Sequence, residues 1–525
     1  MARPAARELR LKPGPALLAF LQKAGRAGLG IVQAPLTRAF TPRTNPLHHL
    51  GALIIFFCWI VLISGIWLLI FFRTSVSGAF ESIEYLTREQ WYLGGIMRSL
   101  HRYASDAAVL VLLLHLLKEF AEDNYRQNRW FSWVTGLPLV WLVFPLGITG
   151  YWLVWDELAQ YVAITSAELL DRIPIFTNSM AGNFLSDAAL SDRFFTLMAF
   201  LHLIGLPIFL VFGIWLHVFR LSGPRINPPR ELMSGTLLSL LLLSVVFPAQ
   251  SQDKADLAQA TQSIQMDWFY LHHYPLVQAW SPGWVWLLLV SVSGLLLVAP
   301  WLPPARKAQP ARVDLDNCNG CTRCADDCPF SAIQMMPRSD GKSYEQEAVV
   351  DPELCVSCGI CVGACPTATP FRSRSDLLPG IDLPRLSMAG LRERLLAHGP
   401  QEHDVLAFAC RGSKALAQLT KTGEQVVEVE CMGQLPPAFI DFVLSRKVAR
   451  GVFLGGCGAG GCHYRYGADW TEQRVSRLRD PQLRKRVDDS RVLVAWRDTA
   501  EHQPHVLRQL AQFRDALRQK SGGEP

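Results

Sequence analysis

The chain has 525 residues, of which 50% are hydrophobic and only 18% are charged. This length predicts several structural units, because a domain commonly holds about 150 residues. Typical soluble domains carry about 25% charged residues, so the composition excludes a purely soluble enzyme and a disordered tail. The basic loops of a membrane protein explain the net charge of +6, and we expect no nucleic-acid partner.

Six apolar stretches predict membrane-crossing helices, since about 20 residues span a bilayer. Six crossings place both termini on one side. Arg and Lys are more frequent in the tail and loops of that side, which identifies it as the cytoplasm. We therefore expect a multi-pass protein of the inner membrane of a prokaryote, with its cysteine-rich end in the cytoplasm. The stretches are residues 48–72, 100–120, 132–155, 196–220, 232–249 and 283–302.

The composition changes along the chain and predicts a multidomain protein. A Pro-rich segment at 299–311 ends the membrane part, and four strands alternate with helices after residue 403. We expect a basic cytoplasmic tail (1–46), a four-helix core (47–225), two further transmembrane helices (226–303), a ferredoxin-like cysteine-rich domain (304–375), a linker helix (376–402) and a small α/β domain with a basic tail (403–525).

Four histidines lie within two of the predicted spans at a repeated spacing. His101 and His115 occupy positions i and i+14 of one span, and His202 and His217 occupy positions i and i+15 of another. At 1.5 Å and 100° per residue, each pair keeps broadly to one helix face and is about 21 to 22 Å apart along the axis. Facing imidazoles at two depths would supply the opposed axial ligands of iron porphyrins. A lone histidine would be a hydrogen-bonded core residue, but ionisable groups are costly in hydrocarbon, so the set predicts function.

Glycines repeat the spacing on two other spans. Gly51 and Gly65 occupy positions i and i+14, as do Gly136 and Gly150. A missing Cβ lets a flat macrocycle approach the backbone, whereas any single glycine could serve ordinary small-residue helix packing. Histidines on two spans and glycines on two others thus occur at the same two depths.

Three stretches of the chain resemble the cytochrome b family of quinol:cytochrome c and plastoquinol complexes. The histidine spacings, i to i+14 and i to i+15, are similar to those of the plastoquinol branch. The resemblance implies an all-α fold in which His101 and His202 hold an outer haem b, and His115 and His217 an inner one. The matching stretches are residues 98–120, 136–165 and 191–224.

The same resemblance implies roles for three charged residues. Arg98 and Arg193 match family arginines near haem propionates; by themselves they would be ordinary rim charges. The family's outer quinone-site motif Pro-Glu-Trp-Tyr is replaced by Met-Asp-Trp-Phe at 266–269. Asp267 keeps an acid there, so it is either a proton-handling residue of a quinone site or a surface loop acid.

Eight cysteines form two copies of the pattern C-x2-C-x2-C-x3-C-P. This is the spacing of bacterial two-cluster ferredoxins, in which the fourth cysteine of each run binds the other cluster. Zinc is the weaker alternative, because its sites use pairs of ligands rather than triplets. One [4Fe-4S] cluster would use Cys318, Cys321, Cys324 and Cys365, and the other Cys355, Cys358, Cys361 and Cys328.

Four more cysteines follow near the C-terminus: Cys410, Cys431, Cys457 and Cys462. Four thiolates can hold [2Fe-2S], [4Fe-4S] or zinc. Residues 403–480 resemble the delta subunit of methyl-viologen-reducing hydrogenase, which implies a [2Fe-2S] cluster on these four. The basic stretch 474–486 is typical of a solvated helix face, with docking of an acidic partner as the alternative.

Five one-electron centres in one chain predict an electron conductor, because protein groups alone transfer single electrons poorly. We expect an oxidoreductase subunit that connects [2Fe-2S], two [4Fe-4S] clusters, the inner haem and the outer haem to a quinone substrate. The resemblances imply a cytoplasmic FAD-containing partner, heterodisulfide-reductase-like or NAD-linked, and a homodimer. The alternatives are a quinol-oxidising branch feeding a low-potential acceptor or flavin bifurcation, and a membrane anchor and relay without its own quinone site.

Overall fold

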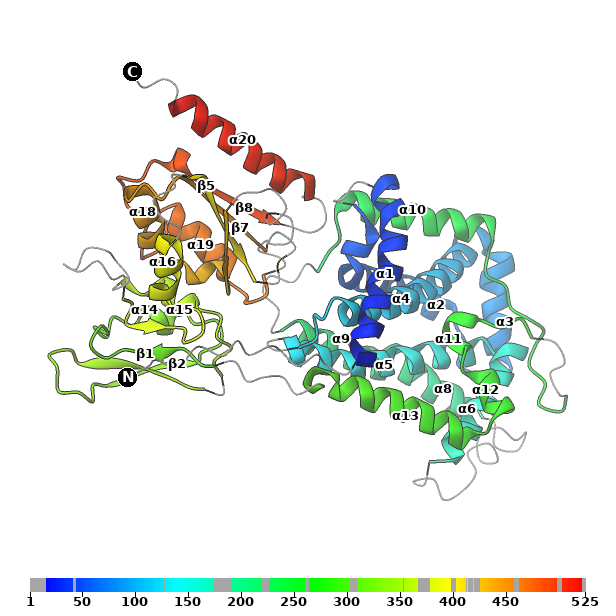
Figure 1. Ribbon diagram of the computed structural model, residues 1–525. Coiled ribbons are helices and arrows are strands. Elements are labelled where there is room, and N and C mark those ends of the chain that lie inside the picture. The colour runs from blue at the N-terminus through cyan, green and yellow to red at the C-terminus, as the bar shows by residue number, and fades with distance from the viewer. Residues whose placement is uncertain are drawn as a thin grey trace. The chain divides into compact units, whose positions relative to one another are not determined.

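The computed structural model contains two compact units, the membrane unit (Met1–Phe40, Thr44–Arg220 and Arg225–Ala305) and the cysteine unit (Arg306–Pro525) (Figure 1). The described residues are 16–40, 44–126, 129–173, 191–219, 226–259, 264–302, 309–352, 354–366, 378–397, 403–411, 413, 419, 425–457, 462–497 and 503–521.

Helices occupy all six stretches in which the sequence predicts membrane crossings. Most are apolar around their whole circumference, as lipid-facing helices are. They are α2 (Leu50–Phe71), α4 (Ile96–Ala121), α5 (Trp130–Val154), the continuous run of α8 (Asp192–Phe200), η5 (Leu201–Gly205) and α9 (Leu206–Val218), α10 (Arg230–Val246) and α13 (Pro282–Val298), which continues as η6 (Ala299–Trp301).

Four described helical segments are long and apolar enough to cross a membrane: Leu50–Phe71, Trp130–Val154, Phe195–Val218 and Pro282–Trp301. Helix α4 is long, with 26 residues, but its first half carries charged side chains. Helix α10 has only 17 residues. A helical region with several apolar helices is therefore established, and the count of six crossings stays a prediction.

Helix α1 (Ala16–Ala39) lies in the segment expected to be a basic tail, and the sequence pattern did not indicate it. It packs against the C-terminal end of α4. The Gln22 side-chain nitrogen donates to Asp123 Oδ1 at 2.9 Å. A Cβ added at Gly25 would lie only 3.0 Å from the Cβ of Ala121, so the two helices are in close contact.

Short helices fill the connections of the membrane unit. The side chain of Asp156 caps one of them, since its Oδ1 accepts the Ala159 N–H at 2.9 Å. The short helices are η1 (Pro46–His48), α3 (Gly78–Glu84), η2 (Tyr85–Glu89), η3 (Trp91–Gly95), α6 (Glu157–Asp171), α11 (Trp268–Leu271) and α12 (Tyr274–Ala279).

The first half of the cysteine unit contains two small antiparallel sheets and short helices. Strand β1 (Arg312–Val313) pairs with β4 (Ile381–Asp382), and β2 (Ile333–Pro337) pairs with β3 (Gln346–Val350). The expected linker helix is present as α16 (Met388–Ala397). The other helices are α14 (Arg323–Asp326) and α15 (Ile360–Ala364).

The second half is an α/β layer around a parallel sheet, with four strands after residue 402, as the sequence predicts. The strand order is β6-β5-β7-β8. Side chains alternate along β5, so that Leu406 and Phe408 face one core and Val405 and Ala407 another. The elements are β5 (His403–Cys410), β6 (Gln425–Val429), η8 (Met432–Gln434), α18 (Pro437–Ser445), β7 (Ala449–Cys457), α19 (Gly467–Val475), η10 (Asp489–Arg491), β8 (Val492–Arg497) and α20 (Gln503–Ser521).

The two halves of the cysteine unit share one hydrophobic core. Cys324, Cys361 and Leu391 from the first half belong to the same buried cluster as Phe408 and Phe439 from the second. Helix α20 covers the opposite face of the sheet, where Phe513 and Leu517 pack against β5 and β7 (Figure 1). The cysteine ligands predicted for different centres are therefore attached to a single packed body.

Candidate metal centres

Helices α2 and α4 place a glycine opposite a histidine at each of two levels. A Cβ added at Gly65 would lie 3.0 Å from Cε1 of His101, and one added at Gly51 would lie 3.7 Å from Cε1 of His115. The spacing from i to i+14 is the same on the two helices, which allows both contacts in one antiparallel register. The space left by each missing Cβ is next to an imidazole ring. The sequence analysis expected this space to admit the macrocycle, whereas the structure shows the histidine ring beside it.

Helix α5 repeats this arrangement with the continuous run of η5 and α9. A Cβ at Gly150 would lie 2.8 Å from Cε1 of His202, and one at Gly136 would lie 3.0 Å from Cε1 of His217. A Cβ at Gly150 would be closer to the His202 ring than real Cβ atoms come, so that imidazole would have to move. One at Gly136 would be tighter than most real contacts, so the His217 ring would have to shift by a few tenths of an ångström. The structure thus pairs each predicted glycine with one predicted histidine.

A π-helical turn explains why His217 follows His202 at i+15 rather than at i+14. The turn η5 (Leu201–Gly205) contains His202. Pro207 follows immediately, in the first turn of α9, and has no N–H to donate to an α-helical bond. A π-turn adds one residue without adding a full α-helical step. The i to i+15 spacing with a π-turn therefore keeps His202 and His217 on one face, as the i to i+14 spacing does for His101 and His115 on α4.

His101 and His202 face each other across the two helix pairs. Their ring centroids are 6.2 Å apart, and the rings are inclined by 59°. A metal–imidazole nitrogen bond is about 2.0 Å long and the nitrogen lies roughly 1.1 Å from the ring centre, so imidazoles on opposite faces of one iron have centroids about 6 Å apart. The two imidazoles would therefore be able to hold one haem iron between them.

Backbone carbonyl groups orient both histidines of this pair. Nδ1 of His101 lies 3.0 Å from the carbonyl oxygen of Val61, and Nδ1 of His202 lies 2.9 Å from that of Leu146. Each carbonyl belongs to the residue four positions before the facing glycine. An Nδ1–H group that donates to a carbonyl fixes the tautomer in which Nε2 is free to bind metal.

The second pair, His115 and His217, has different surroundings. Nδ1 of His115 is 3.8 Å from Glu119 Oε1. The His217 imidazole is buried, and Ser132, four residues before Gly136, is its backbone hydrogen-bonding neighbour. A bis-imidazole site is compatible with both levels, but only the level of His101 and His202 is fixed by two backbone carbonyls.

The two arginines predicted near haem propionates lie in different environments. Arg98 is buried, donates to the hydroxyl groups of Thr87 and Ser251, the latter at 2.8 Å, and lies 3.7 Å from Glu84 Oε1. Arg193 is exposed in the first turn of α8. Their roles toward propionates stay predictions.

Asp267 is buried, which excludes the alternative of a surface loop acid. Its side chain is 2% exposed, and Arg102 Nη2 lies 2.7 Å from its Oδ2. The Tyr151 hydroxyl donates to the same oxygen, while Oδ1 accepts the Phe269 N–H at 2.8 Å and caps α11. The carboxyl of Asp106 is also within hydrogen-bond reach of Asp267, a neighbour that the sequence analysis did not single out.

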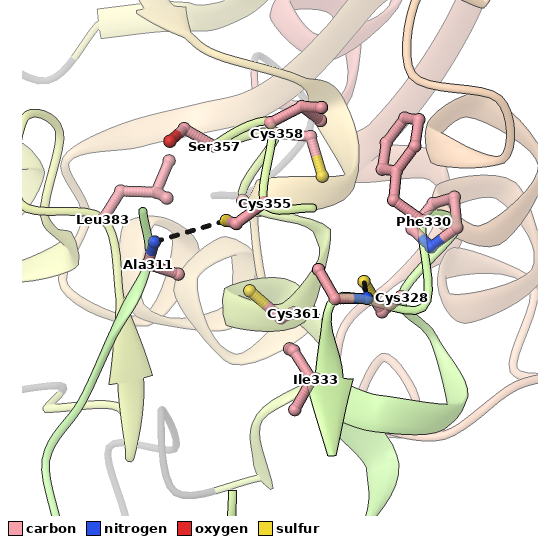
Figure 2. Close-up of a pocket in the computed structure, with 13 residues that line it drawn as sticks. Ala311, Cys328, Phe330, Ile333, Cys355, Ser357, Cys358, Cys361 and Leu383 are labelled. Atoms are coloured by element: carbon pink, nitrogen blue, oxygen red, sulfur yellow. Dashed lines mark hydrogen bonds between the residues drawn. The ribbon is translucent and has the colours of Figure 1, made fainter. Parts of the chain in front are cut away.

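The four cysteines of the second predicted cubane site line one cavity. Cys328, Cys355, Cys358 and Cys361 surround a small cavity together with Ile333 and other apolar residues (Figure 2). Burial raises the pKa of Cys361 well above its ordinary value, and the other three thiols and Cys324 raise it further. Such crowded thiols favour a bound cation that removes their protons.

The other predicted set is also brought together. Burial raises the pKa of the Cys324 thiol to about 12, and the nearby thiols of Cys365, Cys321 and Cys318 raise it further. Cys365 therefore lies among the cysteines of the other run, as the crossed pairing requires. Backbone N–H groups point at the sulfurs, including Gly380 N to Cys365 Sγ at 3.2 Å, which is typical of iron-sulfur surroundings.

The two cysteine loops have matching backbone turns. The residues on either side of the second cysteine have positive φ in both loops: Gly320 and Thr322 in one, Ser357 and Gly359 in the other. Such turns direct successive N–H groups into a concave space that suits an anionic cluster. The repeat seen in the sequence is thus repeated in the backbone.

The last four cysteines form a ring of sulfur contacts at the carboxyl edge of the parallel sheet. Cys410 and Cys457 end strands β5 and β7. Cys431 and Cys457 hydrogen-bond to Cys410 and hold its pKa well below the ordinary value, and Cys462 contacts Cys431 and Cys457. Among the described residues, no three His, Cys, Asp or Glu side chains already converge on a single metal position. The glycine-rich segment 458–461, between Cys457 and Cys462, lies outside the described residues.

Residues between the last two cysteine sets hold them close together. Cys358, Ile360, Cys431 and Tyr464 form one buried cluster. Burial raises the pKa of Tyr464, and the charges of Glu430, Cys358 and Cys431 raise it further. Tyr464 is therefore near a cysteine from each set.

Arg474 provides a polar link between the same regions, and the sequence analysis missed it. The stretch 474–486 was expected to be a solvated face, yet the Arg474 side chain is only 1% exposed and forms an ion pair with Asp327. Burial lowers its pKa, while Asp327 opposes that change. Arg479 also binds Asp327, and Arg474 Nη1 donates to the Gly433 carbonyl at 3.2 Å. A run of basic residues gives no signal of which member turns inward.

Models of three protein families match separate parts of the chain. Cytochrome b/b6/petB matches residues 37–223, the 4Fe-4S dicluster domain residues 317–369, and the delta subunit of methyl-viologen-reducing hydrogenase residues 405–519. The chain is a fusion of regions similar to these three families. The resemblances inferred from the sequence motifs are confirmed.

Two individual proteins are similar to parts of this chain. Cytochrome b6 of Gracilaria tenuistipitata var. liui is 26% identical over 188 residues, which are 36% of this chain and 87% of that protein. A chain of a hyperthermophilic respiratory Complex III matches 50% of this chain and 75% of its own length, with 18% identity and a TM-score of 0.40. The fusion contains an integral membrane, cytochrome b-like redox region and a 4Fe-4S domain, so it has a role in membrane electron transfer.

Proposed function

We propose that this chain is the membrane subunit of an oxidoreductase that passes electrons between a cytoplasmic FAD-containing protein and a quinone. The main support is the twofold repetition of a histidine opposite a glycine on α2 with α4 and on α5 with α9. One chain thereby offers two bis-imidazole levels in its membrane unit and three sets of cysteines in its cysteine unit.

Two b haems are proposed for the membrane unit, an outer one on His101 and His202 and an inner one on His115 and His217. When bound, haems and iron-sulfur clusters exchange single electrons. On each helix the two histidines stand about 21 Å apart along the axis, which separates the two levels. We propose that the four facing glycines keep the imidazoles in place.

The cysteine unit is proposed to bind two [4Fe-4S] clusters and one [2Fe-2S] cluster. The shared cluster of Cys358, Ile360, Cys431 and Tyr464 supports a short separation between the second and third sites. The first [4Fe-4S] site would use Cys318, Cys321, Cys324 and Cys365, the second Cys355, Cys358, Cys361 and Cys328, and the [2Fe-2S] site Cys410, Cys431, Cys457 and Cys462.

The match to a hydrogenase delta subunit at 405–519 supports a soluble redox partner on the cytoplasmic side. We propose a heterodisulfide-reductase-like or NAD-linked flavoprotein, with both termini of this chain in the cytoplasm of a prokaryote. A homodimer through the cytochrome b-like region completes the proposal.

Cofactor counting on the purified full chain tests the centres. We expect two haems by pyridine haemochrome assay and ten irons with ten acid-labile sulfides in the clusters, following from two [4Fe-4S] and one [2Fe-2S]. His217→Ala should remove one haem and leave the iron-sulfur EPR signals unchanged. His272→Ala is the matched control, because His272 is an exposed histidine of the same unit. Zinc in place of cluster iron, or no porphyrin, would overturn the proposal.

Quinone binding needs a separate measurement. A quinone analogue added to the reduced chain in lipid nanodiscs should shift the haem optical or EPR spectra at saturating concentration. If no concentration alters the spectra, the chain is an anchor and relay instead. A redox titration of all centres then gives the order of their potentials, and with it the direction of electron flow between quinol oxidation and quinone reduction.

A further inference from the structure

The most unusual group of charges in the membrane unit lies around Arg102 on α4. Asp106 is one turn further along that helix, and Arg102 Nε lies 3.2 Å from its Oδ2. Arg102 Nη2 lies 2.7 Å from Asp267 Oδ2. One guanidinium group therefore forms ion pairs with two carboxyl groups. If both carboxyl groups are ionised, the three side chains have a net charge of −1.

The two carboxyl groups are not equivalent. Asp267 receives three donors: Arg102, the Tyr151 hydroxyl and the Phe269 backbone N–H. Asp106 receives only Arg102 Nε, and its Oδ1 is buried without a donor from any described residue. That carboxyl is within hydrogen-bond reach of Asp267. Three donors stabilise a carboxylate, whereas two carboxyl groups in contact are stable when they share one proton.

We propose that Asp106 and Asp267 form a carboxyl pair that holds one exchangeable proton on Asp106, while Arg102 and Tyr151 fix Asp267 as the anion. The protonated Asp106 donates to Asp267. This assigns proton handling to Asp106, and it makes Asp267, the acid expected from sequence, a positioning residue.

The other titratable groups near the pair are tyrosines and a cysteine. Tyr103 lies on α4 near Asp106, and Tyr270 on α11 donates or accepts at Ser105 Oγ with a separation of 2.6 Å. Cys58 on α2 lies near Tyr270. Arg102 lies 4.7 Å from the centre of the Tyr151 ring on α5. Arg102 is the cation that binds both carboxyl groups of the pair.

In the proposed function, Asp106 would exchange protons with the quinone or quinol. This part of the inference rests on the proposed function. Asp106 first releases its proton to water and becomes a carboxylate. Transfer from a quinol hydroxyl then breaks the quinol O–H bond, leaves the electron pair on the quinol oxygen, and forms a new O–H bond at Asp106. No electron moves in that step. Asp106 follows His101 at i+5 on the same helix, so the site lies about 7.5 Å further along the axis than the outer histidine.

Infrared spectroscopy of the full chain in detergent, without added quinone, tests the proton. We expect a protonated-carboxyl C=O band that shifts in D2O and is lost in Asp106→Asn. Asp192→Asn is the control, because Asp192 is an exposed aspartate of the same unit. A band that persists in Asp106→Asn and disappears in Asp267→Asn would assign the proton to Asp267 and overturn the proposal.

Stability gives an independent readout. Asp106→Asn mimics the neutral carboxyl group and should retain wild-type haem content and thermal stability. Asp267→Asn removes the anion and should lower both. Equal losses in the two variants would contradict the assignment. Because none of these measurements uses quinone, failure of the carboxyl pair is distinguishable from failure of the quinone analogue to perturb the haem spectra.

Discussion

The membrane unit and the cysteine unit hold their candidate ligands by different means. Each histidine stands on a long helix and touches one glycine of the neighbouring helix. The cysteines stand on short loops and strand ends, and residues from both halves of the unit join one core. A change in the membrane unit should therefore affect one level, whereas a change in the cysteine unit should affect several centres together.

The largest expected effect tests the shared body of the cysteine unit. Arg474→Met leaves Asp327 buried with one fewer cation, and breaking a buried ion pair costs about 3 to 5 kcal/mol. We expect a loss of stability near the lower end of that range, because Arg479 still binds Asp327. EPR of the purified variant should show that both the second [4Fe-4S] and the [2Fe-2S] signals decrease, while both haems remain.

Arg323→Ala is the control for this variant. The Arg323–Asp480 pair also connects the two halves, at 3.1 Å, but its side chains are 38% and 56% exposed. Exposed pairs contribute less than about 1 kcal/mol. If Arg474→Met lowers only one cluster signal, the two halves are less dependent on each other than the shared core indicates.

The second prediction concerns the membrane unit and compares two identical substitutions. Gly150→Ala places a Cβ 2.8 Å from His202 Cε1, whereas Gly51→Ala places one 3.7 Å from His115 Cε1. The first contact displaces the imidazole and the second is an ordinary van der Waals distance. We expect Gly150→Ala to lower outer haem occupancy at least tenfold, and Gly51→Ala to retain both haems.

Haem content and low-temperature optical spectra of the two glycine variants measure this difference. Iron-sulfur signals should remain unchanged in both. Simultaneous loss of both haems in Gly150→Ala would show that the levels are coupled, and would remove the contrast with the cysteine unit.

The smallest expected effect is a pH dependence within the cysteine unit. Burial raises the pKa of Asp382 to about 6 from 3.8, although N–H groups of Met388 and Leu383 bond to its carboxylate. The folded state then holds the proton more tightly than the unfolded state. The stability contributed by protonated Asp382 is complete below pH 3.8 and is lost as the pH rises to about 6.

Asp382→Asn removes this dependence. We expect the variant to be more stable than wild type at pH 7.5 by about 1 to 2 kcal/mol, since a shift of this size is on the order of 3 kcal/mol and one backbone hydrogen bond worth about 1 kcal/mol is lost. At pH 5 the difference should be smaller. Thermal loss of cluster absorbance, recorded at both pH values, gives the comparison, and an equal difference at the two values would contradict it.

Local rules predicted most of the candidate sites. Helix periodicity was sufficient to group the four histidines and four glycines, because each helix keeps its own spacing whatever it contacts. The cysteine triplets indicated cubane sites because their spacing is also a local property of the sequence. Asp106 was not found, since its significance depends on Asp267, which belongs to a distant part of the sequence and reaches it only through folding.

Long-range packing also explains the other omissions. Arg474 belongs to a basic run whose composition favours solvent, and only the contact with Asp327 shows that it is buried. Helix α1 was not predicted, because its segment was interpreted from its charge alone. Gln22 and Gly25 contact residues at the C-terminal end of α4. The π-turn at His202 was treated as ordinary helix, because the sequence gives only Pro207 as a signal.

That π-turn makes one place in the bundle tolerant of a change in chain length. Removing one residue from η5 (Leu201–Gly205) would turn the wide turn into a normal one and leave His217 on nearly the same side of α9. The same deletion between His101 and His115 would rotate the rest of α4 by about 100° and carry one histidine away from its partner. Loss of one residue at the wide turn would therefore leave the ligand beyond it in position, whereas the same loss within α4 would not.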